Sequence, residues 1–173
     1  MNLLKTFVVA AALITASSEA YATSEIEGFE NQQRSCMLEA LLFEAGNQPI
    51  IGKLAVAIVI INRKNHIEYP NTICGVVHEG PVNSWWYNTH NRIVPVKHKC
   101  QFSYWCDGKP DNIDEFVGTN PYHESIEIID YLFTNNIPKL LEGATHYHAD
   151  YVSPKWANVL KKVTTIGNHV FYK

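Results

Sequence analysis

Two apolar helical patterns, separated by a short break, constrain the fold of this chain more than any other feature. Residues 35–45 carry apolar side chains at helical spacing, namely Met37, Leu38, Leu41 and Leu42. The pair Gly46-Asn47 is typical of a left-handed helix end. Pro49 then suits the first turn of a second helix, which runs to the basic pair Arg63-Lys64. We therefore expect a mainly helical protein whose core forms around the second helix.

Glu44 occupies an unusual position at the end of the first helix. Its neighbours Phe43 and Ala45 are apolar, and it lies at the negative end of the helix dipole. Both effects disfavour the charged carboxylate, so the pKa of Glu44 is expected to be raised. A carboxyl group with a raised pKa can act as a general acid near neutral pH. The alternative is an ordinary solvated glutamate at a helix end, since most glutamates are exposed.

The rest of the chain is helical at first and strand-like at the end. A short third helix is expected after Pro70, and a fourth from Pro121 to Asn135. Residues 80–110 keep no helical period and are expected to form a loop with short strands. From Ala144 onward, β-branched and aromatic residues predict strands, with a turn at Gly167-Asn168. The fold class expected is α+β, mainly helical.

The N-terminus has the features of a secretory signal peptide over residues 1–22. A lysine precedes an apolar run, and Ala20-Tyr21-Ala22 is a small-residue cleavage site. The apolar run is shorter than the roughly 20 residues that span a bilayer, so cleavage is preferred to a membrane anchor. The polar residues 23–34 are expected to form a flexible leader, and residues 35–173 a single domain. The mature protein is therefore expected to be secreted, in the periplasm or extracellular space, without stable membrane insertion.

The charge balance excludes some classes of partner. The net charge is −3, which argues against bulk electrostatic attraction to nucleic acid or to an anionic membrane. Any polyanionic partner would have to be recognised by a local patch. No nucleic-acid partner is expected.

The four cysteines are expected to form disulfides, because an exported protein folds in an oxidising compartment. Four cysteines allow three pairings. Cys100 and Cys106 are close in sequence and can close a small loop, which would leave Cys36 paired with Cys74. The alternative is a zinc site, but the chain has no Cys-x-x-Cys pair.

His146 and His148 form a second candidate site. If residues 146–148 are a strand, the two histidines face the same side and Tyr147 faces the other. Two such histidines can bind zinc when a third ligand arrives from elsewhere. The alternative is a pair of hydrogen-bonding histidines that line a polar cleft.

Aromatic residues are concentrated between residues 85 and 105. They are Trp85, Trp86, Tyr87, Phe102, Tyr104 and Trp105. Aromatic faces and indole N–H groups suit sugar rings as well as bases, although several of these side chains could simply fill the core. Basic residues are few in this region, which disfavours a nucleic-acid groove. A sugar-binding cleft that includes Trp105 is therefore expected.

Together these stretches resemble the SleB-type cell-wall hydrolases, a family that includes spore-cortex-lytic enzymes. The similarity extends from about Cys36 to Lys173. It rests on blocks in the family's order: Phe43-Glu44-Ala45, Pro49, Gly52, Ala55-Val56-Ala57, Val59, Asn62-Arg63, Tyr69-Pro70-Asn71-Thr72, Cys100-Gln101-Phe102-Ser103, Cys106-Asp107-Gly108, residues 143–150, Pro154-Lys155-Trp156-Ala157, Ile166-Gly167-Asn168-His169 and Phe171-Tyr172.

The resemblance implies a lysozyme-like fold, in which a helical lobe and a small β-rich lobe flank a glycan cleft. It also implies cleavage of the bond between N-acetylmuramic acid and N-acetylglucosamine, and Glu44 matches the family's catalytic glutamate. The family usually continues with Arg-Gly-Glu after Glu-Ala, whereas this chain has Gly46-Asn47-Gln48. The second acidic position is therefore an amide here.

The number of matched carboxylates indicates the mechanism. A hydrolytic glycosidase normally uses two, one on either side of the bond, and only Glu44 matches the family, while Asp107 and Asp150 are merely acidic and near motifs. One glutamate suffices when the 6-hydroxyl of the sugar is the nucleophile. We therefore favour a lytic transglycosylase that gives 1,6-anhydro products without a metal or cofactor. The residues expected to bind the glycan are Gln101, Ser103, Tyr147, His146, His148 and Trp105.

Two alternatives come from other functional classes. A zinc amidase would cut between muramic acid and the stem peptide, with His146 and His148 as ligands and Glu44 as base. A non-catalytic module would bind peptidoglycan strands through the aromatic cleft and would not need the acid. In all three cases the partner is peptidoglycan, and we expect a monomer.

Overall fold

The computed structural model describes residues 25–135 and 137–173, and the predicted signal peptide lies outside them. By its contacts the chain divides into two units, Met1–Arg34 and Ser35–Lys173. The flexibility expected of residues 23–34 stays a prediction, but residues 25–34 of the first unit are helical. The reason is local: Glu30 accepts a hydrogen bond from Nε of Arg34 at 3.0 Å, one helical turn away, among other good helix formers.

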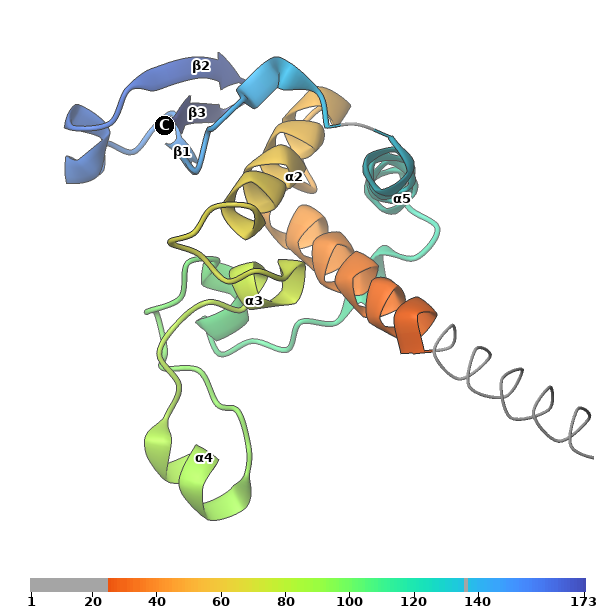
Figure 1. Ribbon diagram of the computed structural model, residues 1–173, viewed down its shortest axis with the longest axis vertical. Coiled ribbons are helices and arrows are strands. Elements are labelled where there is room, and N and C mark those ends of the chain that lie inside the picture. Colours follow the sequence, from red (N-terminus) through yellow and green to blue (C-terminus); the bar gives the residue numbers. More distant parts are fainter. Residues whose placement is uncertain (1–24, 136) are drawn as a thin grey trace, which may run out of the picture. The chain divides into compact units, whose positions relative to one another are not determined.

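The second unit is built around one central helix. Helical residues 35–45 are followed by α2 (Ile50–Lys64), α3 (Ile73–Val77), α4 (Ser84–His90) and α5 (Asn120–Thr134). Figure 1 shows α2 between the sheet and α5. The expected core helix and the expected fourth helix are confirmed, and the structure adds short 3-10 helices η1 (Ser103–Cys106), η2 (Ile113–Phe116), η3 (Lys139–Leu141) and η4 (Lys155–Asn158).

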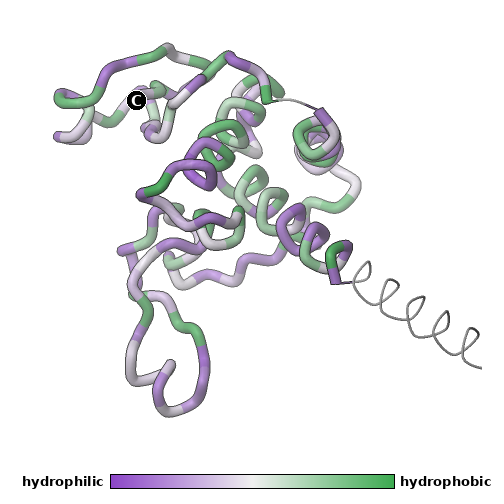
Figure 2. Tube along the Cα trace, viewed as in Figure 1, coloured by the Kyte–Doolittle hydropathy of each residue, from purple (hydrophilic) through white to green (hydrophobic). Residues whose placement is uncertain are grey.

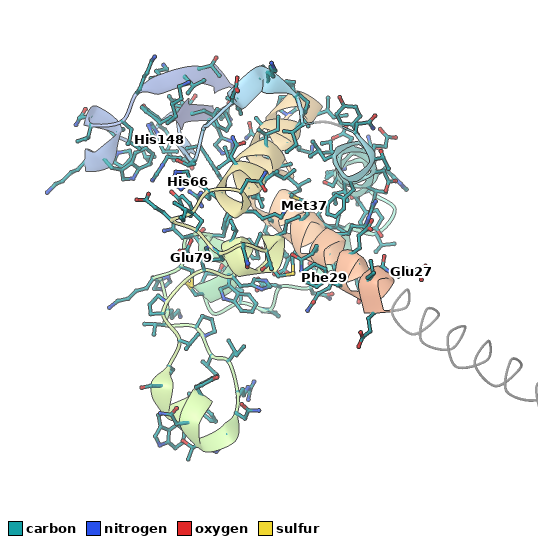
Figure 3. All side chains as sticks on the ribbon, in the orientation of Figure 1. Glu27, Phe29, Met37, His66, Glu79 and His148 are labelled. Carbon is teal, nitrogen blue, oxygen red and sulfur yellow. A yellow bond between two sulfur atoms is a disulfide. The ribbon has the colours of Figure 1, made fainter. Side chains whose placement is uncertain are left out.

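The core lies on both sides of α2. On one side Val56 and Ile60 pack with Met37 and the other apolar residues of helix 35–45, together with α3 and α5. Figure 2 shows the apolar stretches concentrated where these helices meet, and Figure 3 shows Met37 within this group. On the other side Ile58 packs with Phe171 of the sheet. Because both sides of α2 are covered, its middle turns are buried all round.

The C-terminal part forms the expected small sheet. Strands β1 (His146–Ala149), β2 (Lys162–Ile166) and β3 (His169–Tyr172) are antiparallel in the order β1-β3-β2. β3 lies in the centre, and all four of its residues are buried. The expected turn joins β2 to β3, and Gly167 adopts a φ of +57°, which glycine adopts without strain.

The expectation of short strands in residues 80–110 is wrong. This stretch contains helices α4 and η1, and its isolated β pairing joins Val82 to Pro95. The Asn83 side chain accepts hydrogen bonds from the backbone N–H groups of Trp85 and Trp86 at 3.1 and 3.3 Å, so it caps the start of α4. Asn91 ends the helix in the left-handed conformation, at a φ of 47°.

Two disulfides hold the helical part together. They join Cys36 to Cys74 and Cys100 to Cys106, with Cα–Cα distances of 5.2 and 6.1 Å, as expected from the sequence. The first ties helix 35–45 to α3, and the second closes the loop that carries η1. Within the described residues, none of the helices has the length and apolar character needed to cross a membrane.

Candidate active site

Glu44 lies in the last turn of helix 35–45 and is partly buried. The chain must turn sharply just behind it. Gly46 does not have the expected left-handed conformation. Instead, a Cβ atom at this position would collide with the backbone carbonyl of Leu42. Glycine is needed here because the turn packs closely against the end of the helix.

Three groups contact the Glu44 carboxylate from other parts of the fold. The backbone amides of Ser103 and Tyr104, at the start of η1, donate hydrogen bonds to it. The Tyr147 hydroxyl donates a long hydrogen bond of 3.5 Å to Oε2. Burial raises the pKa of Glu44 above its ordinary value of 4.5, while these donors, and more weakly the nearby charge of Arg63, oppose the rise. The pKa of Glu44 is raised, as expected, and burial is the largest cause.

The end of α2 brings Tyr147 over Glu44. The Asn62 side-chain amide donates hydrogen bonds to the carbonyls of Leu141 and Ala144, each at 2.8 Å. Nε of Arg63 donates to the carbonyl of Thr145 at 2.6 Å. These bonds fix the segment that enters β1. Arg63 was not among the residues expected to line the cleft, yet it does so. It is 5 % exposed, and its guanidinium lies over the ring of Phe102.

Glu44 lies where two adjoining hollows meet, and together they form a cleft. One hollow, of about 580 Å³, is bordered by helix 35–45, the following turn and Asn168. The other, of about 390 Å³, is bordered by β1, Gln101, Ser103 and Trp156. Both are lined by Glu44, Ala149, Tyr151 and His169. Among the described residues that line this cleft, Glu44 is the sole carboxylate.

Two hydrogen bonds made by Gln48 hold the turn after Glu44 in place. Oε1 of Gln48 accepts a hydrogen bond from the backbone N–H of Asn168 at 3.0 Å, which docks the β2–β3 turn against it. The Gln48 carbonyl accepts a hydrogen bond from Nζ of Lys53 at 2.7 Å. Lys53 is 2 % exposed and also pairs with Oε2 of Glu124 on α5 at 2.7 Å. The amide at position 48 thus positions the cleft wall without adding charge to it.

His146 and His148 both face Trp156, on the other side of β1 from the ring of Tyr147. Nδ1 of His146 lies 2.9 Å from Oγ1 of Thr145. The two ring nitrogens of His148 lie 2.9 Å from the carbonyl of Ala149 and 3.0 Å from the hydroxyl of Tyr172. In residues 25–135 and 137–173, no three His, Cys, Asp or Glu side chains are grouped so that they could hold a metal ion. The hydrogen-bond distances of both histidines and their place in the cleft lining fit the alternative of a polar cleft. Figure 3 shows His148 among the side chains of the sheet.

The structure brings together most of the predicted binding residues. Five of them line the hollow beside β1: Gln101, Ser103, His146, Tyr147 and His148. Trp105 is not brought to the cleft. Its ring stacks on His78 at 3.8 Å and packs against the core, because η1 turns it away from Ser103.

His169 is a cleft residue that the sequence argument missed. It is 7 % exposed, its ring packs on that of Tyr147 at 5.0 Å, and its Nδ1 is buried without a hydrogen-bond partner. Burial lowers its pKa, and the neighbouring carboxylate of Asp150 partly offsets this. The sequence feature that could have indicated this role is the position of His169 at the start of the last strand. It directly follows the turn that docks against Gln48.

Comparison with known proteins identifies the family. The family model described as cell wall hydrolase matches residues 47–172. The chain belongs to this family. The match begins three residues after Glu44, and it contains η1, all three strands and the cleft-lining residues from Asn47 onward.

Relatives and solved structures agree with this family. The chain is 35 % identical over 151 residues to a spore cortex-lytic enzyme of Bacillus cereus, and 36 % identical over 61 residues to that of Bacillus subtilis. The first match covers 87 % of this chain and 48 % of the relative, so the chain spans about half the length of that curated relative. The second covers 35 % of this chain and 20 % of the relative.

The fold is also similar to a solved structure, the catalytic domain of the germination-specific lytic transglycosylase SleB from Bacillus anthracis. The two superpose with a TM-score of 0.50 at 22 % identity. That superposition covers 82 % of this chain and 93 % of the other, and it confirms the expected lysozyme-like fold.

The contact between Tyr147 and Glu44 leads to a prediction about pH. The Tyr147 hydroxyl lowers the pKa of Glu44, so Tyr147→Phe should raise that pKa further. If the protonated form of Glu44 is the active one, activity persists to higher pH in the variant, and the alkaline limb of kcat/KM moves upward. The measurement is the pH profile of muropeptide release from purified cell walls. Tyr172→Phe is the matched control, because its hydroxyl contacts His148 instead of Glu44; an equal shift there would contradict the assignment.

Proposed function

We propose that this chain is an exported enzyme of the periplasm or extracellular space that degrades peptidoglycan, with residues 35–173 as its catalytic domain. In this proposal it cleaves the bond between N-acetylmuramic acid and N-acetylglucosamine as a lytic transglycosylase. The observation that carries the proposal is that Glu44 is the one carboxylate among the described residues lining the cleft. The names of the relatives, spore cortex-lytic enzymes, support the same substrate class.

The first step requires a neutral carboxyl group. Glu44, whose pKa is raised by burial, donates its proton to the glycosidic oxygen while the bond from that oxygen to C1 of muramic acid breaks. The resulting carboxylate is stabilised by the backbone amides of Ser103 and Tyr104 and by the Tyr147 hydroxyl. Burial therefore favours the protonated form of Glu44 before proton transfer. The hydrogen-bond donors around it stabilise the carboxylate that forms afterwards.

The second step uses the same side chain as a base. The Glu44 carboxylate takes the proton of the muramic acid 6-hydroxyl while that oxygen forms a bond to C1. The product is a 1,6-anhydro sugar, and Glu44 regains its proton for the next cycle. A retaining hydrolase would need a second carboxylate about 5 Å from the first, and an inverting one at roughly 6.5–9.5 Å. Asp107 is hydrogen-bonded to the backbone of Lys109, and neither it nor Asp150 lines the cleft.

The remaining cleft residues suit a glycan. Gln101 and Ser103 offer an amide and a hydroxyl beside Glu44, and Trp156 offers an aromatic face next to His146 and His148. Such groups can hydrogen-bond N-acetyl groups and stack on sugar rings. We assign Gln101, Ser103, Tyr147, His146 and His148 to substrate binding in this proposal.

Mass spectrometry of muropeptides from digested, purified cell walls tests the reaction type. Products that end in 1,6-anhydro-muramic acid are expected. Reducing muramic acid ends, which are heavier by one water, would indicate a hydrolase instead. Release of free stem peptides would indicate an amidase.

Chelation separates the proposal from the zinc amidase. The engagement of His146 and His148 with Thr145, Ala149 and Tyr172 favours a structural or binding role for the pair. We therefore expect release of muropeptides to continue at an unchanged rate after prolonged dialysis against EDTA. Loss of activity on dialysis, with recovery on addition of zinc, would assign the histidines to a metal site.

A further inference from the structure

The aromatic stretch of the sequence is only partly used by the cleft. Its first half lies on a projecting arm, residues 81–98, which Figure 1 shows at the far end of this unit from the sheet. The arm is ordered at its base: the backbone N–H of Asn83 donates to the carbonyl of Val94 at 2.7 Å, and that of Val96 to the carbonyl of Pro81 at 2.8 Å. At its tip α4 buries none of its residues. From residue 81 to residue 93, every side chain is exposed except that of Trp86, which is half-buried.

The arm exposes large apolar and aromatic side chains. Trp85 is 58 % exposed, Tyr87 51 % and Ile93 62 %. Trp86 contacts the rings of Trp85 and His90 and lies under the guanidinium of Arg92, all within the arm. Several large exposed apolar side chains on one short segment indicate an interaction site.

The charge of the arm is opposite to that of the chain. Residues 81–98 contain Arg92 and Lys97 and no Asp or Glu, and Lys99 follows directly at the base of the arm, whereas the net charge of the whole chain is −3. The charge pattern therefore selects an anionic partner, recognised locally by this arm.

The ring geometry distinguishes a lipid surface from a glycan. A glycan strand stacks on flat, successive aromatic faces, but the planes of Trp85 and Trp86 are inclined by 80°. The aliphatic side chains of Val82 and Ile93, both exposed on the arm, add surface that suits acyl chains better than sugars. Trp and Tyr favour the membrane–water interface, and adjacent Lys and Arg favour anionic headgroups.

We propose that the α4 arm docks this protein on the surface of an anionic lipid bilayer. Trp85, Tyr87 and Ile93 enter the interface, while Arg92, Lys97 and Lys99 contact the headgroups. The cleft that contains Glu44 is made by other elements, so it stays open while the arm is bound. The proposed membrane-binding surface of the arm is separate from the cleft, and binding to the bilayer does not depend on the proposed reaction.

Co-sedimentation with vesicles tests this proposal. The purified protein is expected to pellet with phosphatidylglycerol–phosphatidylcholine vesicles and much less with phosphatidylcholine alone. Trp85→Ser/Trp86→Ser/Tyr87→Ser should weaken binding by about tenfold or more. Arg92→Gln/Lys97→Gln/Lys99→Gln, which keeps the aromatics, should weaken binding to anionic vesicles on the order of 100-fold. Because these side chains lie outside the core, both variants should release muropeptides from solubilised glycan at the wild-type rate.

Two controls make the result specific. Tyr131→Ser and Ile67→Ser remove side chains that are 46 % and 98 % exposed elsewhere, and they should bind vesicles as the wild type does. Glu44→Gln should also bind normally, so vesicle binding is tested independently of the proposed reaction. Failure of the wild type to pellet with anionic vesicles, or equal binding by the aromatic variant, would overturn the proposal. Loss of pelleting with purified peptidoglycan in the aromatic variant, without vesicle binding by the wild type, would assign the arm to the glycan instead.

Discussion

Replacement of Glu44 by glutamine is expected to reduce cell-wall lysis to background while the protein stays folded. Glutamine keeps the shape of the side chain, but it cannot deliver a proton to the glycosidic oxygen. General acid–base catalysis contributes roughly 10²–10⁴-fold, and no second carboxylate among the described lining residues can replace Glu44. The measurement is the initial rate of turbidity loss in a suspension of purified walls, with glycan binding measured by pull-down.

The same substitution should not cost stability. Because burial raises the pKa of Glu44 in the folded protein, ionising it opposes folding. The stability linked to this group is fully present below the ordinary pKa of 4.5 and is lost as pH rises through the higher folded value. At neutral pH Glu44→Gln is therefore expected to match or exceed the wild type in free energy of unfolding.

The controls are two carboxylates outside the cleft. Asp107→Asn and Asp150→Asn should retain clearly measurable lysis under the same conditions. An inactive but folded Asp150→Asn or Asp107→Asn would favour a two-carboxylate hydrolytic mechanism. Wild-type lysis by Glu44→Gln would remove the basis of the proposed function.

The largest expected loss of stability comes from the ion pair between Lys53 and Glu124. Glu124→Ala leaves the ammonium group of Lys53, 2 % exposed, with the Gln48 carbonyl as its remaining described partner. Breaking a buried pair costs several kcal/mol, and about 3 kcal/mol is expected here, since Glu124 is 37 % exposed. This corresponds to a fall in Tm of roughly 6–12 °C for a domain of this size.

Urea unfolding of matched variants measures this cost. Glu127→Ala removes an exposed glutamate one turn further along α5 and should change the free energy of unfolding by no more than about 0.5 kcal/mol. Lys53→Met removes the buried charge together with the need for its partner, so it should cost less than Glu124→Ala. Equal losses for Glu124→Ala and Glu127→Ala would show that the pair contributes little.

The sequence predicts elements well where apolar periodicity continues through an entire segment. The helix at Ile50–Lys64 and the strands after Ala144 follow their patterns closely. The pattern fails in residues 80–110, because α4 has no buried face to generate a period. Its signals are instead the capping residues Asn83 and Asn91, which are local and easily read as turns.

A residue of the candidate site can be predicted from the sequence only when its neighbours along the chain already give it an unusual environment. Glu44 has such an environment, and the alternation in β1 correctly separates Tyr147 from His146 and His148. Arg63 and His169 could not be assigned in this way, because their importance depends on which distant segments pack against them. Trp105 shows the converse: an aromatic residue in a promising loop lies on η1 and packs against the core instead of lining the cleft.

The distance along the chain between Glu44 and Tyr147, 103 residues, has a consequence for biosynthesis. Tyr147 lies on β1, which is an edge strand held by the later strand β3. Glu44 is therefore made early, but the contact with Tyr147 that completes its surroundings exists only after β3 has emerged and paired with β1. Until that pairing forms, a nascent chain carries Glu44 without the β1 residues that line one wall of its cleft.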